Sequence, residues 1–194
     1  MRTIVCTSLK GGSGKSTIVV NLAVEAERQG LGPVAIADTD SPQGSASHWW
    51  NIRDAHAPLF ARELEVEGIE LLVVDTAPQV AQDKIIRRAD FVIIPVRPSP
   101  NDLRAVGEII SVVEKCKKPF CFVVNGVKPR ATITGETVRV LEKHGAVAPV
   151  LLGDRVDFAV SMIDGLAVSE MAPASRSARE IAELWKYVDT QMRK

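Results

Sequence analysis

The segment that most constrains the fold of this chain is a glycine-rich run at residues 9–17, which reads Leu-Lys-Gly-Gly-Ser-Gly-Lys-Ser-Thr. It closely follows an apolar run at residues 3–6 and leads into a segment with a helical pattern. A strand, a glycine-rich turn and a helix in this order form a cradle for phosphate. The glycines let backbone N–H groups approach the anion, and the helix N-terminus adds partial positive charge. In such a cradle Lys15 can reach the β- and γ-phosphates of a nucleotide, and the Ser16 hydroxyl can bind Mg²⁺.

Short β-branched runs alternate with longer helical segments along the rest of the chain. The expected strands are residues 2–7, 33–37, 70–75, 91–96, 120–125 and 147–152, and the expected helices are 16–29, 45–55, 80–88, 102–115, 133–144, 157–164 and 175–191. Most strand segments are continuously apolar, as is typical of strands buried on both faces of a parallel sheet. The pattern predicts an α/β fold with a doubly wound, mostly parallel sheet flanked by helices. The chain has 194 residues and no linker or repeat, so we expect one domain over residues 1–194.

Composition restricts the compartment and the partners. The formal net charge is +0, so any contact with nucleic acid must come from a local patch. The three cysteines, Cys6, Cys116 and Cys121, form no CxxC pair, which predicts buried thiols in a reducing environment. No apolar stretch approaches the roughly 18 residues that cross a bilayer, and the first residues lead straight into a strand. We therefore expect a soluble, cytoplasmic protein without a signal peptide.

Carboxylates follow two of the expected strands. Residues 38–40 read Asp-Thr-Asp after the second strand, and Asp75 begins an Asp-Thr-Ala-Pro segment at the end of the third. Because parallel strands end at one edge of the sheet, Asp40 and Asp75 are expected near Lys15 and Ser16, where Mg²⁺ and an attacking water need partners. For Asp38, a helix-capping or turn role is an equally good explanation. Together these residues predict a hydrolysis site.

These motifs carry a family resemblance. Residues 10–17 resemble the deviant Walker A motif of the ParA/MinD family of ATPases, residues 38–44 its second motif, and residues 74–78 its switch II. Residues 89–102 are similar to a segment of short, ParF-like partition ATPases, and the similarity continues at residues 123–125 and 154–156. One departure is Ser41, which stands between Asp40 and Pro42 where the family reads Asp-x-Asp-Pro-Gln. An extra residue there can shift the loop that follows.

The resemblance implies a P-loop ATPase with ATP and Mg²⁺ as cofactors. According to this resemblance, Lys10 reaches the phosphates bound by the other subunit of a nucleotide-sandwich dimer. Lys15 holds the β- and γ-phosphates, and Asp40 positions the attacking water. Asn125 is the candidate for reading adenine, and a turn role before Gly126 is an equal alternative. The other residues expected to bind nucleotide are Gly11, Gly12, Ser13, Gly14, Ser16 and Thr17, and those expected at the metal are Ser16, Asp40 and Asp75.

The resemblance also implies a slow ATPase that works as a switch. ATP closes a homodimer, and hydrolysis stimulated by a ParB-like or cargo adaptor protein releases it. The leading hypothesis is partition of plasmid or chromosomal DNA. The alternative is positioning of a protein cargo, such as a microcompartment or a chemoreceptor cluster, on the nucleoid. A MinD-like membrane-associated ATPase is less favoured. A small-molecule kinase is also less favoured, since a kinase has no need of Lys10. Because the sequence begins at the first strand, we expect no N-terminal helix-turn-helix and no autorepression.

The C-terminal helix carries the predicted DNA contact. Its basic residues near one face are Arg176, Arg179, Lys186 and Arg193. Members of the family bind DNA without sequence preference as ATP dimers, so these residues predict a nonspecific DNA-binding patch on a nucleoid-associated protein. An ordinary solvated helix face is an equal alternative. Membrane anchoring by this helix is not favoured, because Asp189 and Gln191 interrupt its apolar residues.

Overall fold

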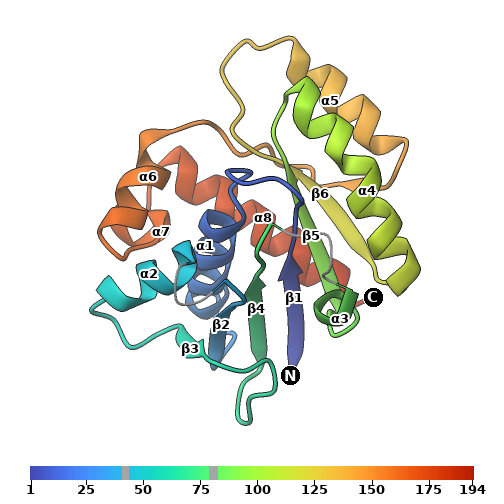
Figure 1. Cartoon of the computed structure of the whole chain (residues 1–194). Coiled ribbons are helices and arrows are strands. Elements are labelled where there is room, and N and C mark those ends of the chain that lie inside the picture. Colours follow the sequence, from blue (N-terminus) through green and yellow to red (C-terminus); the bar gives the residue numbers. More distant parts are fainter. Residues whose placement is uncertain (41–43, 79–82) are drawn as a thin grey trace.

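The computed structural model describes residues 1–40, 44–78 and 83–194. Among them, seven parallel strands form one sheet in the order β3-β2-β4-β1-β5-β6-β7 (Figure 1). The strands are β1 (Arg2–Cys6), β2 (Val34–Asp38), β3 (Leu59–Ala61), β4 (Leu71–Asp75), β5 (Phe91–Val96), β6 (Phe120–Val124) and β7 (Ala146–Val147). The helices are α1 (Lys15–Arg28), α2 (Ser45–Ile52), α3 (Asp83–Ile86), α4 (Pro100–Cys116), α5 (Ile133–Glu142), α6 (Val156–Ile163), α7 (Val168–Met171) and α8 (Arg176–Met192). The predicted doubly wound α/β fold is confirmed.

The glycine-rich loop lies at the point in the sheet where the order of the strands reverses. β1 sits between β4 and β5, with β2, β3 and β4 on one side of it and β5, β6 and β7 on the other. The loop after β1 therefore projects from the C-terminal edge at the point where crossover connections diverge, the usual ligand position in open α/β sheets. Strand order alone thus brings the ends of β2, β4, β5 and β6 around this loop.

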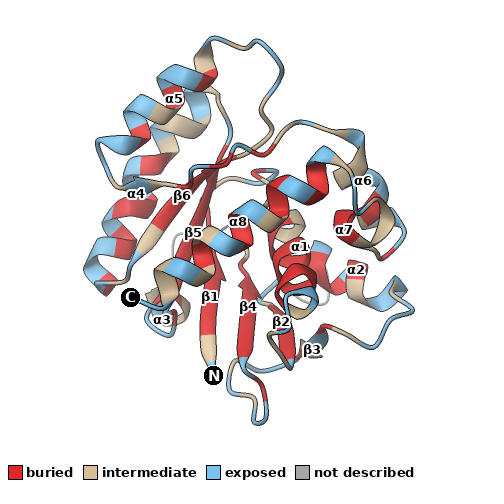
Figure 2. Ribbon diagram, turned by 180° about the vertical axis from the view of Figure 1, so that it is seen from behind, coloured by how far each residue is buried: buried red, intermediate tan, exposed pale blue. Residues whose placement is uncertain are grey.

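Helices cover both faces of the sheet. α1 and α8, with α2, α6 and α7, pack on one face, and α3, α4 and α5 pack on the other (Figures 1 and 2). Alternate residues of β1 serve the two layers, with Ile4 and Cys6 in one core cluster and Val5 in the other. Burial on both faces explains why the strand segments are continuously apolar rather than alternating.

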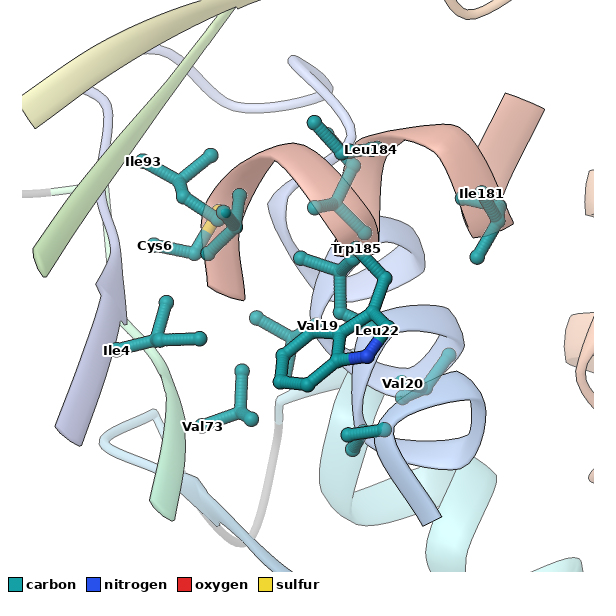
Figure 3. Close-up of a cluster of buried hydrophobic side chains, with 14 of the residues drawn as sticks. Ile4, Cys6, Val19, Val20, Leu22, Val73, Ile93, Ile181, Leu184 and Trp185 are labelled. Atoms are coloured by element: carbon teal, nitrogen blue, oxygen red, sulfur yellow. The ribbon is translucent and has the colours of Figure 1, made fainter. Parts of the chain in front are cut away.

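The core behind the loop joins β1, α1 and α8. Figure 3 shows Ile4 and Cys6 of β1 beside Val19 and Leu22 of α1, with Trp185 of α8 closing the cluster. Trp185 is only 4% exposed, so α8 is a structural part of this layer rather than a mobile tail. All three cysteines are buried and free, as the sequence predicts.

The last expected strand is wrong over most of its length. Instead of residues 147–152, only Ala146–Val147 form β7. The chain still runs along β6, since Ala148 N donates to Phe122 O (2.9 Å) and Leu152 N to Val124 O (3.0 Å). Four residues on this segment span two on β6, so the chain bulges between the two bonds. Pro149 lies in the bulge, where its missing N–H removes no ladder bond.

Two short elements escape the sequence pattern. β3 has three residues and α7 has four, too few for a periodic signal to develop. α3 begins at Asp83, and the start of the expected helix at residues 80–88 lies outside the described residues. In the part of the chain that the structure describes, no helix is both long and apolar enough to cross a membrane.

Candidate functional site

The loop between β1 and α1 has a backbone that only glycine adopts comfortably. Gly14, the residue before α1, has φ +95°. A Cβ on Gly14 would stand 2.1 Å from Nδ2 of Asn125, so that side chain would have to move, and the positive φ strains the backbone of any residue other than glycine. The first N–H groups of α1 have no partner within the helix and are turned toward this loop.

Lys15 lies inside the loop rather than in solvent. Its side chain is buried at 7% exposure, and Nζ donates to Lys10 O (3.4 Å) and Ser8 Oγ (3.5 Å). Ser8 and Ser13 share a hydrogen bond of 2.7 Å between their hydroxyls, which ties the two ends of the loop together. Among the described residues no carboxylate forms an ion pair with Lys15. The loop thus holds a buried cation at the centre of a ring of polar groups, an arrangement suited to an anionic ligand.

Ser16 and Asp75 meet at the mouth of the loop, as the sequence predicts. Ser16 Oγ donates to Asp75 Oδ2 at 2.5 Å, while Asp75 Oδ1 is buried without a hydrogen-bond partner in the described structure. Burial raises the pKa of Asp75 from its ordinary 3.8 to about 7; the Ser16 hydrogen bond and the charge of Lys15 lower it, and the charge of Asp38 raises it. A hydroxyl and a carboxylate with a free buried oxygen are the ligand types that Mg²⁺ prefers.

The two aspartates after β2 have different surroundings. Asp38 Oδ2 accepts from the backbone N (2.9 Å) and the hydroxyl (3.0 Å) of Ser47, and Oδ1 accepts from Asp40 N (2.9 Å). Asp38 is therefore not an N-cap residue, since the N-cap of α2 is Gly44; its carboxylate closes a turn onto Asp40 and binds the first turn of α2 from outside the helix. Asp40 is exposed at the same edge of the sheet as the loop. Its predicted catalytic and metal roles stay predictions, and the Ser41 insertion lies outside the described residues.

Asn125 contacts the loop directly, an arrangement that the sequence does not predict. Its Nδ2 donates to Ser13 O at 2.7 Å, across the edge from β6 to the loop after β1. The next residue, Gly126, has φ +68°, as the turn alternative expects. Asn125 thus supports the loop backbone, and its role in reading adenine stays a prediction.

Arg97 is a residue of this edge to which sequence reasoning assigned no role. Its Nη1 lies 3.8 Å from the position that a Cβ would take on Gly12, and its Nε lies 3.6 Å from the corresponding position on Gly126. The backbone is held in place because Ser99 N donates to Arg97 O (2.7 Å) and the Ser99 hydroxyl caps α4. The guanidinium has no hydrogen bond or ion pair within the described residues. A signal was present in the sequence: an arginine directly after a buried central strand, at the edge where ligands bind.

The four basic residues predicted to contact DNA, three on α8 and Arg193 directly after it, are exposed, but part of their charge is offset. Arg176 contacts Glu180 (3.2 Å), and Arg193 contacts Asp189 (2.7 Å). Arg179 and Lys186 form no ion pair among the described residues. Figure 2 shows the outer face of α8 free of covering segments. The predicted DNA patch thus exists as an exposed face with two unpaired cations, and DNA binding by it stays a prediction.

Comparison with known proteins agrees with this geometry. A family model described as the CobQ/CobB/MinD/ParA nucleotide binding domain (CbiA) matches residues 4–166. "Maintenance of carboxysome distribution protein A" of Halothiobacillus neapolitanus is 29% identical over 202 residues, covering 92% of this chain and 91% of that protein. "Protein ParA" of Rhizobium radiobacter is 30% identical over 116 residues, covering 53% of this chain and 51% of that protein.

A solved structure shows the same fold at low sequence identity. The septum site-determining protein MinD of Pyrococcus horikoshii, complexed with Mg-ADP, superimposes with a TM-score of 0.79 at 16% identity, covering 98% of this chain and 96% of that one. The loop geometry, the strand order and the family match over residues 4–166 lead to one assignment. The chain belongs to the MinD/ParA group of nucleotide-binding P-loop ATPase domains.

Proposed function

We propose that this protein is an ATP-dependent, dimerising switch that positions a protein assembly in the cell together with an adaptor protein. The observation that carries the choice of cargo is the 29% identity to the carboxysome distribution protein of H. neapolitanus, which extends over 92% of this chain. The nucleotide switch rests on the buried Lys15 inside the loop and on the contact between Ser16 and Asp75.

ATP binding follows from the polar groups of the loop. Residues 11–17 and the first N–H groups of α1 would hold the phosphates, and Lys15, which contacts Lys10 O and Ser8 Oγ, would supply the positive charge for the β- and γ-phosphates. Ser16 and Asp75 fit a magnesium ion, because Asp75 Oδ1 is buried without a partner and both residues offer oxygen. When bound there, Mg²⁺ neutralises charge on the β- and γ-phosphate oxygens.

Two further cations serve the closed state. Lys10, half-buried at the rim of the loop, reaches the phosphates of the partner subunit, and Arg97 faces the same rim from the end of β5. Two ATP molecules buried face to face require such cations to offset their charge. Asp40 orients the attacking water from the exposed loop after β2. Hydrolysis removes the γ-phosphate from this arrangement and thereby releases the dimer.

Two lysine substitutions test the switch. Lys15→Ala removes the buried cation and is expected to abolish ATP binding. Lys10→Ala leaves the loop of its own subunit intact, so it is expected to retain much of the ATP affinity but to lose dimerisation and adaptor-stimulated hydrolysis. Affinity, oligomeric state and release of free phosphate are measured on both. Normal ATP-dependent dimerisation and normal stimulated turnover of Lys10→Ala would refute the sandwich dimer, and phosphoryl transfer to a metabolite would favour a kinase.

DNA partition is the second candidate, because the ParA protein of R. radiobacter is 30% identical over 53% of this chain and α8 exposes basic residues. Deletion of the gene from cells distinguishes the two candidate functions. Loss of a plasmid or chromosome from daughter cells supports partition. Clustered or misplaced protein assemblies with normal DNA inheritance support positioning.

A further inference from the structure

The side chain of Arg97 crosses from one loop of the nucleotide edge to another. Arg97 directly follows β5, which pairs in parallel with β1, so it starts at the same edge of the sheet as the glycine-rich loop (Figure 1). Its Cγ and Nε both lie 3.6 Å from the position that a Cβ would take on Gly126, and its Nη1 lies 3.8 Å from the corresponding position on Gly12. The aliphatic part of the side chain therefore passes the loop after β6, and the guanidinium reaches the glycine-rich loop.

The backbone of Arg97 is fixed, whereas its charged end is exposed and unpaired. Arg97 O accepts a hydrogen bond from Ser99 N (2.7 Å), and Pro98 restricts the conformation of the residue before it. Ser99 is itself held at the start of α4, where its hydroxyl accepts from Asp102 N (3.1 Å). Within the part of the chain that the structure describes, the guanidinium forms no hydrogen bond and no ion pair. A side chain fixed at its base and unpaired at its charged end is well placed to meet a ligand.

The surroundings of the guanidinium favour an anion. Arg97 lines an open hollow of about 440 Å³ beside the glycine-rich loop, and the other charged residues that line it are Lys128 and Asp154. Among the described residues, Asp154 forms no ion pair with either cation. Two cations and one carboxylate leave the hollow with a surplus of positive charge, which attracts an anionic group.

The contacts of Lys15 indicate which phosphates Arg97 can meet. Nζ of Lys15, the group suited to the β- and γ-phosphates, lies against Lys10 O and Ser8 Oγ at the start of the loop. Gly12 lies further along the loop, between that end and the N-terminus of α1. The backbone N–H groups of such a loop surround the α- and β-phosphates. The guanidinium beside Gly12 is therefore placed for the phosphates that ADP and ATP share.

Support of the loop is a weaker explanation for Arg97. Asn125 already holds the loop, since its Nδ2 donates to Ser13 O at 2.7 Å. Arg97 donates to no backbone oxygen of the loop in the described structure, although a guanidinium has five N–H donors for such contacts. These donors are thus available to a ligand.

We propose that Arg97 is a nucleotide-binding residue whose guanidinium binds the α- and β-phosphates held by its own subunit. The proposal rests on nucleotide binding at the glycine-rich loop, but it does not require the closed dimer. A guanidinium can bind two phosphate oxygens through parallel N–H bonds, which a lysine cannot reproduce. Because ADP and ATP share these phosphates, Arg97 contributes to the binding of both, whereas a cation that acts only in the closed dimer contributes to the binding of ATP alone.

The test is ADP binding by the full chain with Mg²⁺, measured by calorimetry on Arg97→Gln and Arg97→Lys. The control is Arg139→Gln, which removes the same charge from an exposed arginine near the C-terminal end of α5. Charge-assisted contacts are strong but screened at an exposed site, so we expect Arg97→Gln to lose at least about fivefold in ADP affinity. Arg97→Lys should recover part of this loss, and Arg139→Gln should match the wild type. The loss should become smaller as salt is added, and the unfolding temperature without ligand should not change.

The other outcomes overturn the proposal in distinguishable ways. A smaller loss of ADP affinity in Arg97→Gln excludes the contact. Normal ADP binding with weakened binding of a non-hydrolysable ATP analogue assigns Arg97 to the terminal phosphate or to the partner's nucleotide. An equal loss in Arg139→Gln indicates a general effect of charge, and a lower unfolding temperature without ligand indicates support of the loop. A wild-type protein that binds neither ADP nor the analogue refutes the nucleotide switch itself.

Discussion

Burial makes the charged form of the Asp75 carboxyl group unfavourable when no ligand is present. Asp75 is 3% exposed, one of its oxygens has no partner in the described structure, and its pKa is raised from 3.8 to about 7, chiefly by burial. An aspartate whose pKa is higher in the folded than in the unfolded protein costs no stability below its unfolded pKa. The loss grows as pH rises from about 4 and is complete above about 7.

We therefore predict that Asp75→Asn stabilises the protein without ligand at alkaline pH. Asparagine keeps the shape and can still accept the hydrogen bond of Ser16, but it carries no charge. At about 1.4 kcal/mol per pKa unit, the raised pKa corresponds to a penalty of about 4 kcal/mol above pH 7, of which about 2–3 kcal/mol develops between pH 5 and pH 8. The gain of the variant over the wild type should increase by that amount over this interval.

The assay is urea denaturation of both proteins at pH 5, 6, 7 and 8 with EDTA and without nucleotide. Taking the difference between the two proteins removes the contributions of all other titrating groups. Adding Mg-ATP at pH 8 should then reverse the order, because the wild type gains stability from binding whereas the variant lacks a metal-binding oxygen. A difference in unfolding free energy that is constant from pH 5 to pH 8, or a variant no more stable than the wild type at pH 8, would refute the reasoning.

Three further predictions concern the surroundings of the site. Asp38→Ala removes the acceptor of Ser47 at the N-terminus of α2 and should cost about 1–2 kcal/mol in urea denaturation; an unchanged midpoint contradicts this role. Gly14→Ala places a Cβ 2.1 Å from Asn125 Nδ2 at a φ of +95°, so calorimetry should show loss of ATP binding, and near-normal affinity would show that the loop yields. Arg179→Glu with Lys186→Glu should abolish DNA binding by the ATP-bound protein in anisotropy titrations at low salt, and unchanged binding would place the DNA surface elsewhere.

Local signals in the sequence are sufficient for the framework of this fold. β5 has its predicted bounds, β1, β4 and β6 differ from theirs by one residue at one end, and β2 is shifted by one residue, because each is a continuous apolar run that no helical period explains. The glycine-rich loop is predictable because its backbone requires glycine at defined positions. The expected strand at residues 147–152 failed because apolar residues at a proline-containing bulge resemble those of a paired strand.

Side chains that meet across the edge of the sheet depend on strand order, which no short segment encodes. Asn125 lies 112 residues from Ser13 along the chain. The two residues meet because only one strand, β5, lies between β1 and β6 in the sheet. The same holds for Arg97 above the loop and for Asp38, whose contact with the first turn of α2 requires α2 to return toward the end of β2. The sequence by itself predicted a phosphate-binding loop at the end of the first strand, since that information is local, and the match to a nucleotide-binding family agrees with it. Only the tertiary structure decided which residues support the loop, because that depends on how distant segments pack.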